Sequence, residues 1–236
     1  MADDPVIEQL YRVFSRYALP ARMVFCDYCD TAEYEESLHA ELSTMPAELV
    51  DKYTWDAMHH TGNQLDFRHF VPRIYQLLWR DELPFADPEM VIGRLAHADW
   101  QDWSAAEHDS VRGVLDGLWD DAMRRQAPPV DIDSLVCGLG LAFRGVPPHV
   151  ENWTTDNRPL AAPRLVEFVL ANASELPEQR LGDPWWEQGR EAMEALVTWL
   201  LTPRVAAFLR ASAEATQDTH PETSEAVRLL DSAAAR

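Results

Sequence analysis

Two cysteines three residues apart, Cys26 and Cys29, are the residues whose types and spacing most clearly indicate chemistry. A Cys-x-x-Cys turn can place two thiolates on one metal ion, which supplies half of a structural zinc site. The other half would need two later side chains, drawn from the histidines His59, His60 and His69 and the carboxylate Asp66. The chain holds no second Cys-x-x-Cys and no His-x-His pair, so two interpretations stay open. Either this segment binds zinc, or both thiols pack under the first helix as reduced side chains.

Two acid-x-x-His pairs, Asp56 with His59 and Asp66 with His69, are similar to the pairs that hold two iron ions in helix bundles. That chemistry needs two further inward carboxylates, and Asp66 is expected to be a helix cap. His69 is either a ligand or a structural side chain that bonds to a backbone carbonyl freed near Pro72. A metal-dependent enzyme that uses the Cys, His and Asp residues of positions 26–69 is therefore the alternative function. The motifs of serine hydrolases, P-loop proteins, zinc proteases and dinucleotide-binding proteins are not in the sequence.

The early Cys-x-x-Cys is followed by Gly62 and then by the run Asp66-Phe-Arg-His-Phe-Val-Pro-Arg73. This combination resembles a family of uncharacterised bacterial all-helical proteins in which the run usually has leucine where this chain has Val71. The matching residues are Cys26, Cys29, Gly62, Asp66, Phe67, His69, Phe70, Pro72 and Arg73. The resemblance covers about the N-terminal half of the chain, and it implies no established activity.

The elements that must position these residues are all predicted to be helices. The pairs Asp4-Pro5, Asp87-Pro88, Asp183-Pro184 and Thr202-Pro203 combine a capping side chain with a proline in the first helical turn. Apolar residues follow these starts at helical spacing, and no segment alternates as a strand would. We expect an all-α protein of about ten helices in antiparallel pairs, stacked as a bundle or as a repeat-like solenoid.

Prolines also suggest where these helices break. Pro128 and Pro129 divide the chain into an N-terminal part (1–127) and a C-terminal part (128–236), which we expect to pack as one continuous domain. Pro72 predicts a short helix at 66–70 and a second helix that begins near Val71.

The chain is strongly acidic, with 40 Asp and Glu against 20 Lys and Arg among 236 residues. Residues 26–56 have a net charge of −8 and residues 81–121 a net charge of −9, out of −20 overall. This balance argues against direct nucleic-acid binding, which needs clustered cations. Such acidic blocks are either solvated helix faces or a surface that binds a basic partner, in which case association depends on salt.

Nine tryptophans are a further source of contact residues. Trp185 and Trp186 are adjacent, so both cannot face one core, and Trp153 lies in a proline-rich stretch. These three are candidate partner-binding residues, with core packing as the alternative.

These patterns together predict a cytoplasmic, non-enzymatic, acidic helical interaction protein. An inhibitor or immunity-type binder of a basic protein is one specific version of it, with zinc as an additional structural element. The expectation of a reducing cytoplasm follows from only three cysteines, from the absence of a signal peptide and from the absence of an apolar run long enough to span a membrane.

Overall fold

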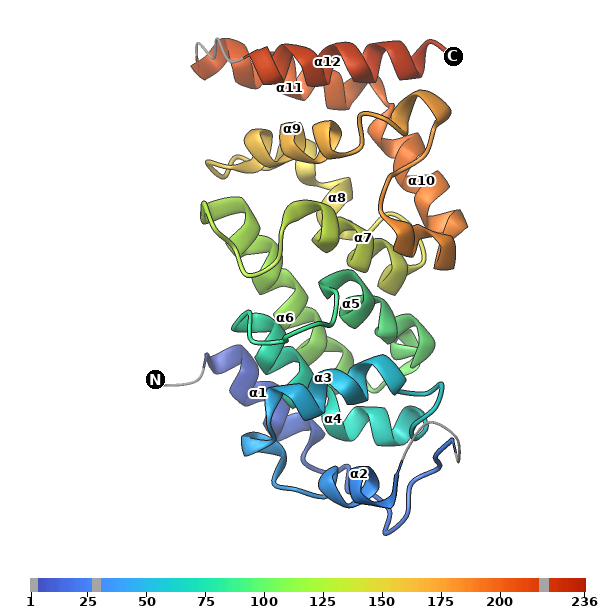
Figure 1. The fold of residues 1–236 in the computed structure, drawn as a ribbon. Coiled ribbons are helices and arrows are strands. Elements are labelled where there is room, and N and C mark those ends of the chain that lie inside the picture. Colours follow the sequence, from blue (N-terminus) through green and yellow to red (C-terminus); the bar gives the residue numbers. More distant parts are fainter. Residues whose placement is uncertain (1–3, 27–30, 217–220) are drawn as a thin grey trace. The chain divides into compact units, whose positions relative to one another are not determined.

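The computed structural model describes residues 4–26, 31–216 and 221–236. Over these ranges the chain forms twelve α-helices and five short 3-10 helices (Figure 1). No β-strand forms in the described ranges, where β-pairing is limited to two isolated bridges. The predicted all-α fold is confirmed. The arrangement in antiparallel pairs stays a prediction.

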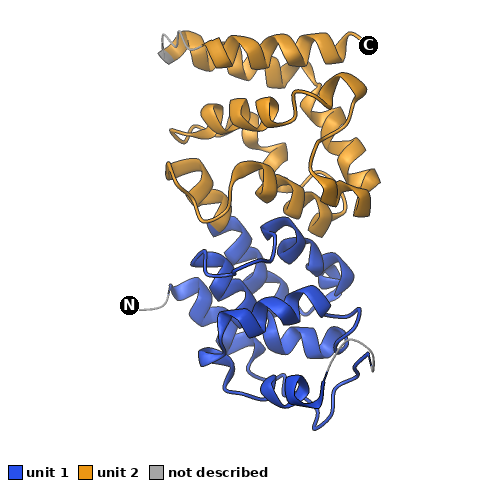
Figure 2. Ribbon diagram, in the orientation of Figure 1, with its two compact units in different colours: residues 1–117 blue, residues 118–236 orange. Residues whose placement is uncertain are grey.

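The chain divides into two compact units, Met1–Gly117 and Leu118–Arg236, here called unit 1 and unit 2 (Figure 2). The division falls inside helix α6 (Ala105–Arg124), whereas the sequence suggested a boundary after residue 127. The double proline does end α6, because the helix stops at Arg124. A helix end and a boundary between compact units are therefore different features in this chain.

Helix α4 is the central element of unit 1. It contacts α1, α3 and α5, and its apolar side chains are buried on several sides. The unit consists of α1 (Pro5–Phe14), α2 (Ala32–Ser37), the 3-10 helix η1 (Leu42–Thr44), α3 (Ala47–Asp56), α4 (Gln64–Trp79), α5 (Pro88–His97), the 3-10 helix η2 (Trp100–Asp102) and the first part of α6.

Pro72 lies inside α4, and the predicted break at this residue is wrong. One continuous helix covers Gln64–Trp79, with Pro72 itself buried. A proline inside a helix removes one backbone hydrogen bond and costs on the order of 3 kcal/mol. Burial of the flanking side chains offsets this cost, since Phe67, Phe70, Ile74, Leu77 and Leu78 are all buried.

Unit 2 is built around α7 (Ile132–Phe143) and α9 (Ala161–Ala171), which contact each other. Its core includes an aromatic group in which Trp153 contacts Trp119, Phe168 and Trp199. The other elements are α8 (Pro148–Glu151), α10 (Arg190–Leu200), α11 (Pro203–Thr216), α12 (Pro221–Ala234) and the 3-10 helices η3 (Trp153–Thr155), η4 (Leu176–Glu178) and η5 (Pro184–Gln188).

The positions of the four predicted proline starts are confirmed, because helical structure begins at Pro5, Pro88, Pro184 and Pro203. The predicted side-chain cap is absent at Asp87, and the hydroxyl of Thr202 donates to the carbonyl of Trp199. Asp4 accepts a hydrogen bond from the N–H of Val6, and Asp183 accepts one from Trp185. Each carboxylate thereby satisfies an amide that has no partner within its helix.

Gly140 in α7 permits a close approach of neighbouring segments in unit 2. A Cβ at this position would lie 2.5 Å from a ring carbon of Trp186 and 2.8 Å from a methyl of Leu196. Glycine at this position therefore lets α7 pack closely against Trp186 and Leu196.

Two buried arginines donate hydrogen bonds to carbonyls at the C-terminal ends of helices. Arg94 donates to the carbonyls of Thr54 and Trp55 at the end of α3, at 3.2 and 2.6 Å. Arg164 donates in the same way to three carbonyls at and after the end of α6, those of Ala122, Arg125 and Gln126. Terminal carbonyls have no partner within their own helix, and a cation also interacts favourably with this end of the helix dipole.

Within the described ranges, no single helix is long and apolar enough to cross a membrane. Helices α10 and α11 reach that length and composition only as a pair, which is bent by 52°.

Candidate functional site

Two loops of unit 1 that contain candidate metal ligands are joined by backbone hydrogen bonds. The N–H of Cys26 donates to the carbonyl of His60 at 2.9 Å, and the N–H of Gly62 donates to the carbonyl of Val24 at 2.7 Å. Between these bonds, Phe25 and Thr61 form an antiparallel bridge. The backbone at Cys26 is therefore held beside the backbone of His60, although 34 positions separate them in the sequence.

Gly62 makes this pairing possible. Its φ of +70° belongs to the left-handed region, which glycine adopts at no steric cost. A Cβ here would lie 2.9 Å from Cε of Met23 and 3.0 Å from Cβ of Asp66. Both the backbone angle and the limited space disfavour a larger residue.

His59 and His60 lie in the turn that follows α3, and both are exposed. They lie outside α3, which ends at Asp56. The ring of His59 faces that of His97, with the two centroids 5.4 Å apart. Partial burial and the nearby charge of Arg94 lower the pKa of His59, so the neutral imidazole is favoured near pH 7.

His69 bonds to a segment other than the one that the sequence suggested. Its Nδ1 lies 2.7 Å from the carbonyl oxygen of Tyr17, just after α1. Because a carbonyl can only accept, Nδ1 must carry the proton. The structural role expected for His69 is thus observed, but its partner is a carbonyl beyond α1 and not one freed beside Pro72.

Asp66 also has a structural role. Its Oδ2 accepts the N–H of Asn63, whose side chain in turn accepts the N–H groups of Leu65 and Asp66. This reciprocal pair is a capping box at the start of α4. The capping role expected for Asp66 is confirmed, although Asn63, and not Asp66, is the N-cap residue.

A polar network next to His69 joins α1, α4 and α6, with the carboxylate of Glu107 at its centre. The Glu107 side chain is 1% exposed, accepts hydrogen bonds from Tyr17 and Ser104, and lies 2.8 Å from Nη2 of Arg16. Arg68 donates to the Tyr17 hydroxyl at 2.9 Å and lies over the ring of Trp103. Burial alone would raise the pKa of Glu107, but the bonds from Ser104, Tyr17 and Arg16 lower it to about 2.

The metal hypothesis stays a prediction. Cys29 lies outside the described residues, so the Cys26–Cys29 pair is not seen. In the ranges that are described, no group of three His, Cys, Asp or Glu side chains is placed to hold a metal ion. The structure brings Cys26 and His60 together through the backbone, and it separates His69 from that set by its bond to Tyr17.

Two of the three candidate contact tryptophans are buried. Trp153 is 0% exposed and donates to the carbonyl of Ala161, and Trp186 is 3% exposed against Gly140. Neither ring is accessible to a partner, which corrects the expectation that they form a contact surface. Trp185 is half-buried, so it is the one member of the adjacent pair that reaches solvent.

An exposed aromatic residue that the sequence analysis did not single out lies in unit 1. Phe85, in the loop between α4 and α5, is 76% exposed, and Trp55 on α3 is 38% exposed. The buried carboxylate of Asp51 accepts the N–H groups of Phe85 and Ala86 at 3.0 and 2.8 Å. The sequence signal for this surface is a phenylalanine between Pro84 and Pro88 in an acidic turn.

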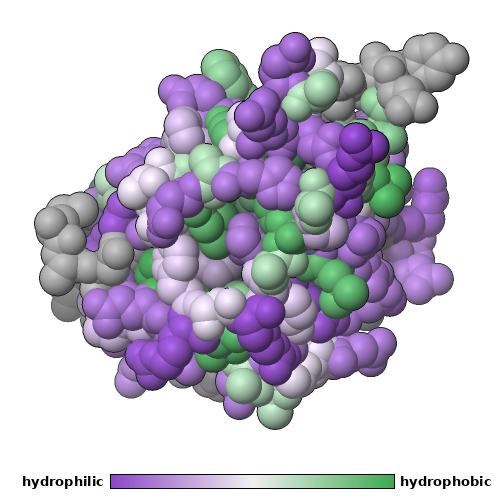
Figure 3. Space-filling model, turned by 90° about the horizontal axis from the view of Figure 1, so that it is seen from below, coloured by the Kyte–Doolittle hydropathy of each residue, from purple (hydrophilic) through white to green (hydrophobic). Residues whose placement is uncertain are grey.

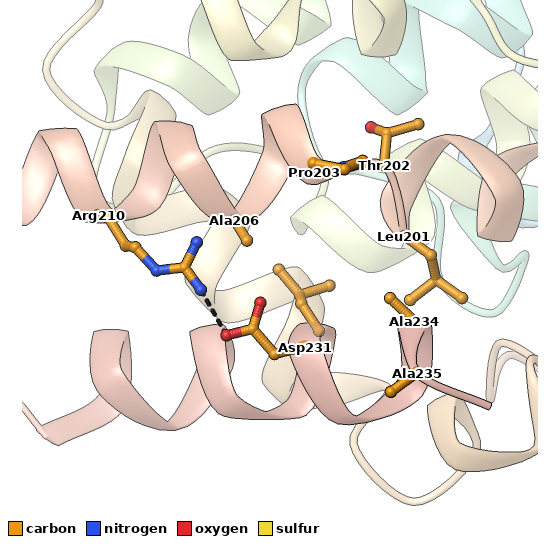
Figure 4. Close-up of a pocket in the computed structure, with 9 residues that line it drawn as sticks. Leu201, Thr202, Pro203, Ala206, Arg210, Asp231, Ala234 and Ala235 are labelled. Carbon is orange, nitrogen blue, oxygen red and sulfur yellow. Dashed lines mark hydrogen bonds and ion pairs between the residues drawn. The ribbon is translucent and has the colours of Figure 1, made fainter.

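A groove of ≈ 260 Å³ lies in unit 2 between α11 and α12, next to the end of α10 (Figure 4). Its walls are small or apolar side chains, except for Thr202 and the ion pair between Arg210 and Asp231. These two charges balance each other, so the groove favours neither cations nor anions.

Comparisons of the chain with protein-family models, with curated proteins and with solved structures find no match.

Proposed function

We propose that the protein is a non-enzymatic, acidic helical interaction protein whose unit 1 binds a basic partner. The observation that carries this proposal is the excess of exposed carboxylates over exposed cations in the described part of unit 1. The exposed carboxylates among its described residues are Glu8, Glu33, Glu36, Glu41, Glu48, Asp81, Glu82, Asp87, Asp99, Asp102, Asp109 and Asp116.

Four of the nine cations in the described part of unit 1 are buried or half-buried. Arg94 is buried against carbonyls, Arg73 is half-buried and donates to the carbonyl of Met45, and Arg68 bonds to Tyr17. The exposed cations of the described part of unit 1 are Arg12, Arg16, Arg22, Lys52 and Arg112. The exposed side chains in the described part of unit 1 therefore comprise twelve carboxylates against five cations, an excess of seven negative charges.

This charge distribution favours a basic protein as the partner. Complementary surface charge raises the association rate and discriminates against partners of like sign. On the face drawn in Figure 3, hydrophobic residues form small separate groups among hydrophilic ones. A mixed surface of this kind suits an interface governed by charge, with a few apolar contacts.

Binding of a fluorescent oligoarginine peptide, followed by anisotropy, tests the proposal. Replacing Glu36, Glu48 and Glu82 by glutamine removes three exposed charges from unit 1. The matched control replaces the exposed Glu187, Glu191 and Glu194 of unit 2 in the same way. We expect the unit 1 variant to bind at least several-fold more weakly than the control, with affinity falling as NaCl rises from about 50 to about 300 mM. Equal loss in both variants, or binding that does not depend on salt, contradicts the proposal.

A structural zinc site near Cys26 is a second candidate feature, favoured by the pairing of Cys26 with His60. We propose His59 or His60, together with Cys26 and Cys29, as its ligands. Metal content per chain, measured on untagged protein without added metal, tests this in the wild type and in a Cys26→Ser, Cys29→Ser variant. Zinc at near one ion per chain that disappears in the variant supports the site, and equal metal in both contradicts it. A metal-dependent enzyme would additionally require an open coordination position at the ion.

A further inference from the structure

Phe85 is a large apolar side chain fixed in solvent by the chain around it. Its own N–H and that of Ala86 donate to Oδ1 of Asp51, which is buried on α3. Ala86, the next residue, is buried. A carboxylate that accepts two backbone amides is a strong anchor, because hydrogen bonds to a charged acceptor are stronger than neutral ones.

The other end of the loop is also fixed. Asp81 follows α4 in the left-handed conformation, with φ of +55°. Its N–H donates to the carbonyl of Leu78, and the N–H of Glu82 donates to that of Leu77. These bonds are those of a helix-ending motif, so the loop is held at both ends and its exposed ring is presented on a rigid support.

Carboxylates flank Phe85 in the sequence, on both sides of it in the loop. Asp81, Glu82 and Asp87 lie in the same loop and are exposed. On α3, the exposed Glu48 comes one turn before Asp51. Trp55 comes one turn after Asp51, and its ring is partly exposed. We call these six side chains, Glu48, Trp55, Asp81, Glu82, Phe85 and Asp87, the Phe85 surface.

We infer that the Phe85 surface binds an arginine-bearing segment of the basic partner, an inference that rests on the proposed function. A guanidinium is planar and weakly hydrated, so it can stack on an aromatic face while its N–H groups pair with carboxylates. The surface offers both kinds of group from segments held in place by Asp51. A second copy of this chain is disfavoured as the occupant, because it carries the same net charge of −20.

The test measures binding of an oligoarginine peptide to full-length protein in which Phe85 is changed. Phe85→Ala removes the ring without altering charge, and Phe85→Leu keeps an apolar side chain without the π-system. Phe85→Trp provides a better cation–π partner. The matched control is Leu65→Ala, which removes another exposed apolar side chain, 60% exposed, from the start of α4. Because Phe85 contributes little to the core, circular dichroism and the melting temperature should be the same for all four variants and the wild type.

We expect Phe85→Ala and Phe85→Leu to weaken binding about three- to tenfold, with Phe85→Trp at or above the wild-type affinity. The slope of affinity against salt should stay the same, because no charge changes.

Wild-type affinity in Phe85→Ala, or an equal loss in Leu65→Ala, overturns the inference. Wild-type affinity in Phe85→Leu overturns the aromatic stacking that it includes. If Phe85→Ala binds normally while the unit 1 glutamine variant does not, only the inference fails. If the glutamine variant also binds normally, the proposed function fails as well.

Discussion

Glu107 should contribute measurably to the stability of unit 1, and Glu107→Gln tests this directly. One carboxylate oxygen accepts the Tyr17 hydroxyl and faces Arg16, while the other accepts the N–H and hydroxyl of Ser104. Glutamine has one acceptor oxygen and one donor NH₂, so it can serve only one of these sides. On the other side, its NH₂ would face existing donors in a buried position.

The size of the effect follows from the pKa of Glu107. A fall from 4.5 to about 2 corresponds to roughly 3 kcal/mol, at 1.36 kcal/mol per pKa unit. Arg16 is 56% exposed, so solvent screens its share and we expect about 2 kcal/mol at pH 7. Because folding lowers this pKa, the stabilisation is present above about pH 4.5 and disappears as the pH falls toward 2.

Urea unfolding followed by tryptophan fluorescence measures the effect, and Trp103, next to Arg68, is a reporter within unit 1. The control is Asp109→Asn, which removes an 80% exposed carboxylate from the same helix. Glu107→Gln should lower the unfolding free energy by about 2 kcal/mol at pH 7, and Asp109→Asn by less than about 0.5 kcal/mol. The difference between wild type and Glu107→Gln should shrink between pH 4.5 and pH 2.5. Equal effects of the two substitutions, or a difference that is independent of pH, would refute the reasoning.

Two further predictions concern unit 2. Burial, together with the nearby Asp183 and Asp131, raises the pKa of Asp133 to about 6 despite its hydrogen bond from Asn172. The contribution of Asp133 to the free energy of unfolding is therefore present below about pH 4 and lost as the pH rises through 6. Asp133→Asn removes the buried carboxylate, so it should raise the melting temperature at pH 7.5 but not at pH 4. Gly140→Ala should lower the unfolding free energy by about 1–3 kcal/mol, because the added methyl overlaps the packed ring of Trp186. Urea titration measures the change in unfolding free energy, and Gly145→Ala is the control, because a Cβ added at the half-buried Gly145 would meet no atom within 4 Å.

Features set by adjacent residues were predictable from the sequence. A proline favours the start of a helix through its own fixed φ, and at Asp4 and Asp183 the preceding side chain also caps the helix, so no distant contact is needed. The inward face of α4 was also visible, because apolar spacing of three and four residues specifies one side of a helix.

The course of α4 through Pro72 could not be predicted in the same way. The local cost of the proline is known from its chemistry, but the compensating burial is supplied by other helices, the neighbouring α3 and α5 and the more distant α1, so it depends on tertiary packing. Local rules therefore predicted two helices where packing favours one.

The candidate site shows the same division between local and distant information. The histidines and cysteines were identified by type, but the pairing of Cys26 with His60 depends on the left-handed Gly62. The sequence does not indicate His97, because its relation to His59 is a contact in space between two separate segments. Phe85 was not identified because apolar periodicity selects residues that point into a core, and Phe85 points out of it.

The single lysine has a practical consequence for labelling. The chain contains one lysine and 19 arginines, and Nζ of Lys52 lies 3.2 Å from the ring centroid of Tyr34, with Asp56 one turn further along α3. An amine-reactive dye or cross-linker therefore has one side-chain target in the whole protein, on the same helix as Glu48 and Trp55. Acylation would remove the positive charge from the Tyr34 contact. Cross-links formed at Lys52 would accordingly report proximity to this one helix, without the ambiguity that many lysines bring to mass-spectrometric mapping.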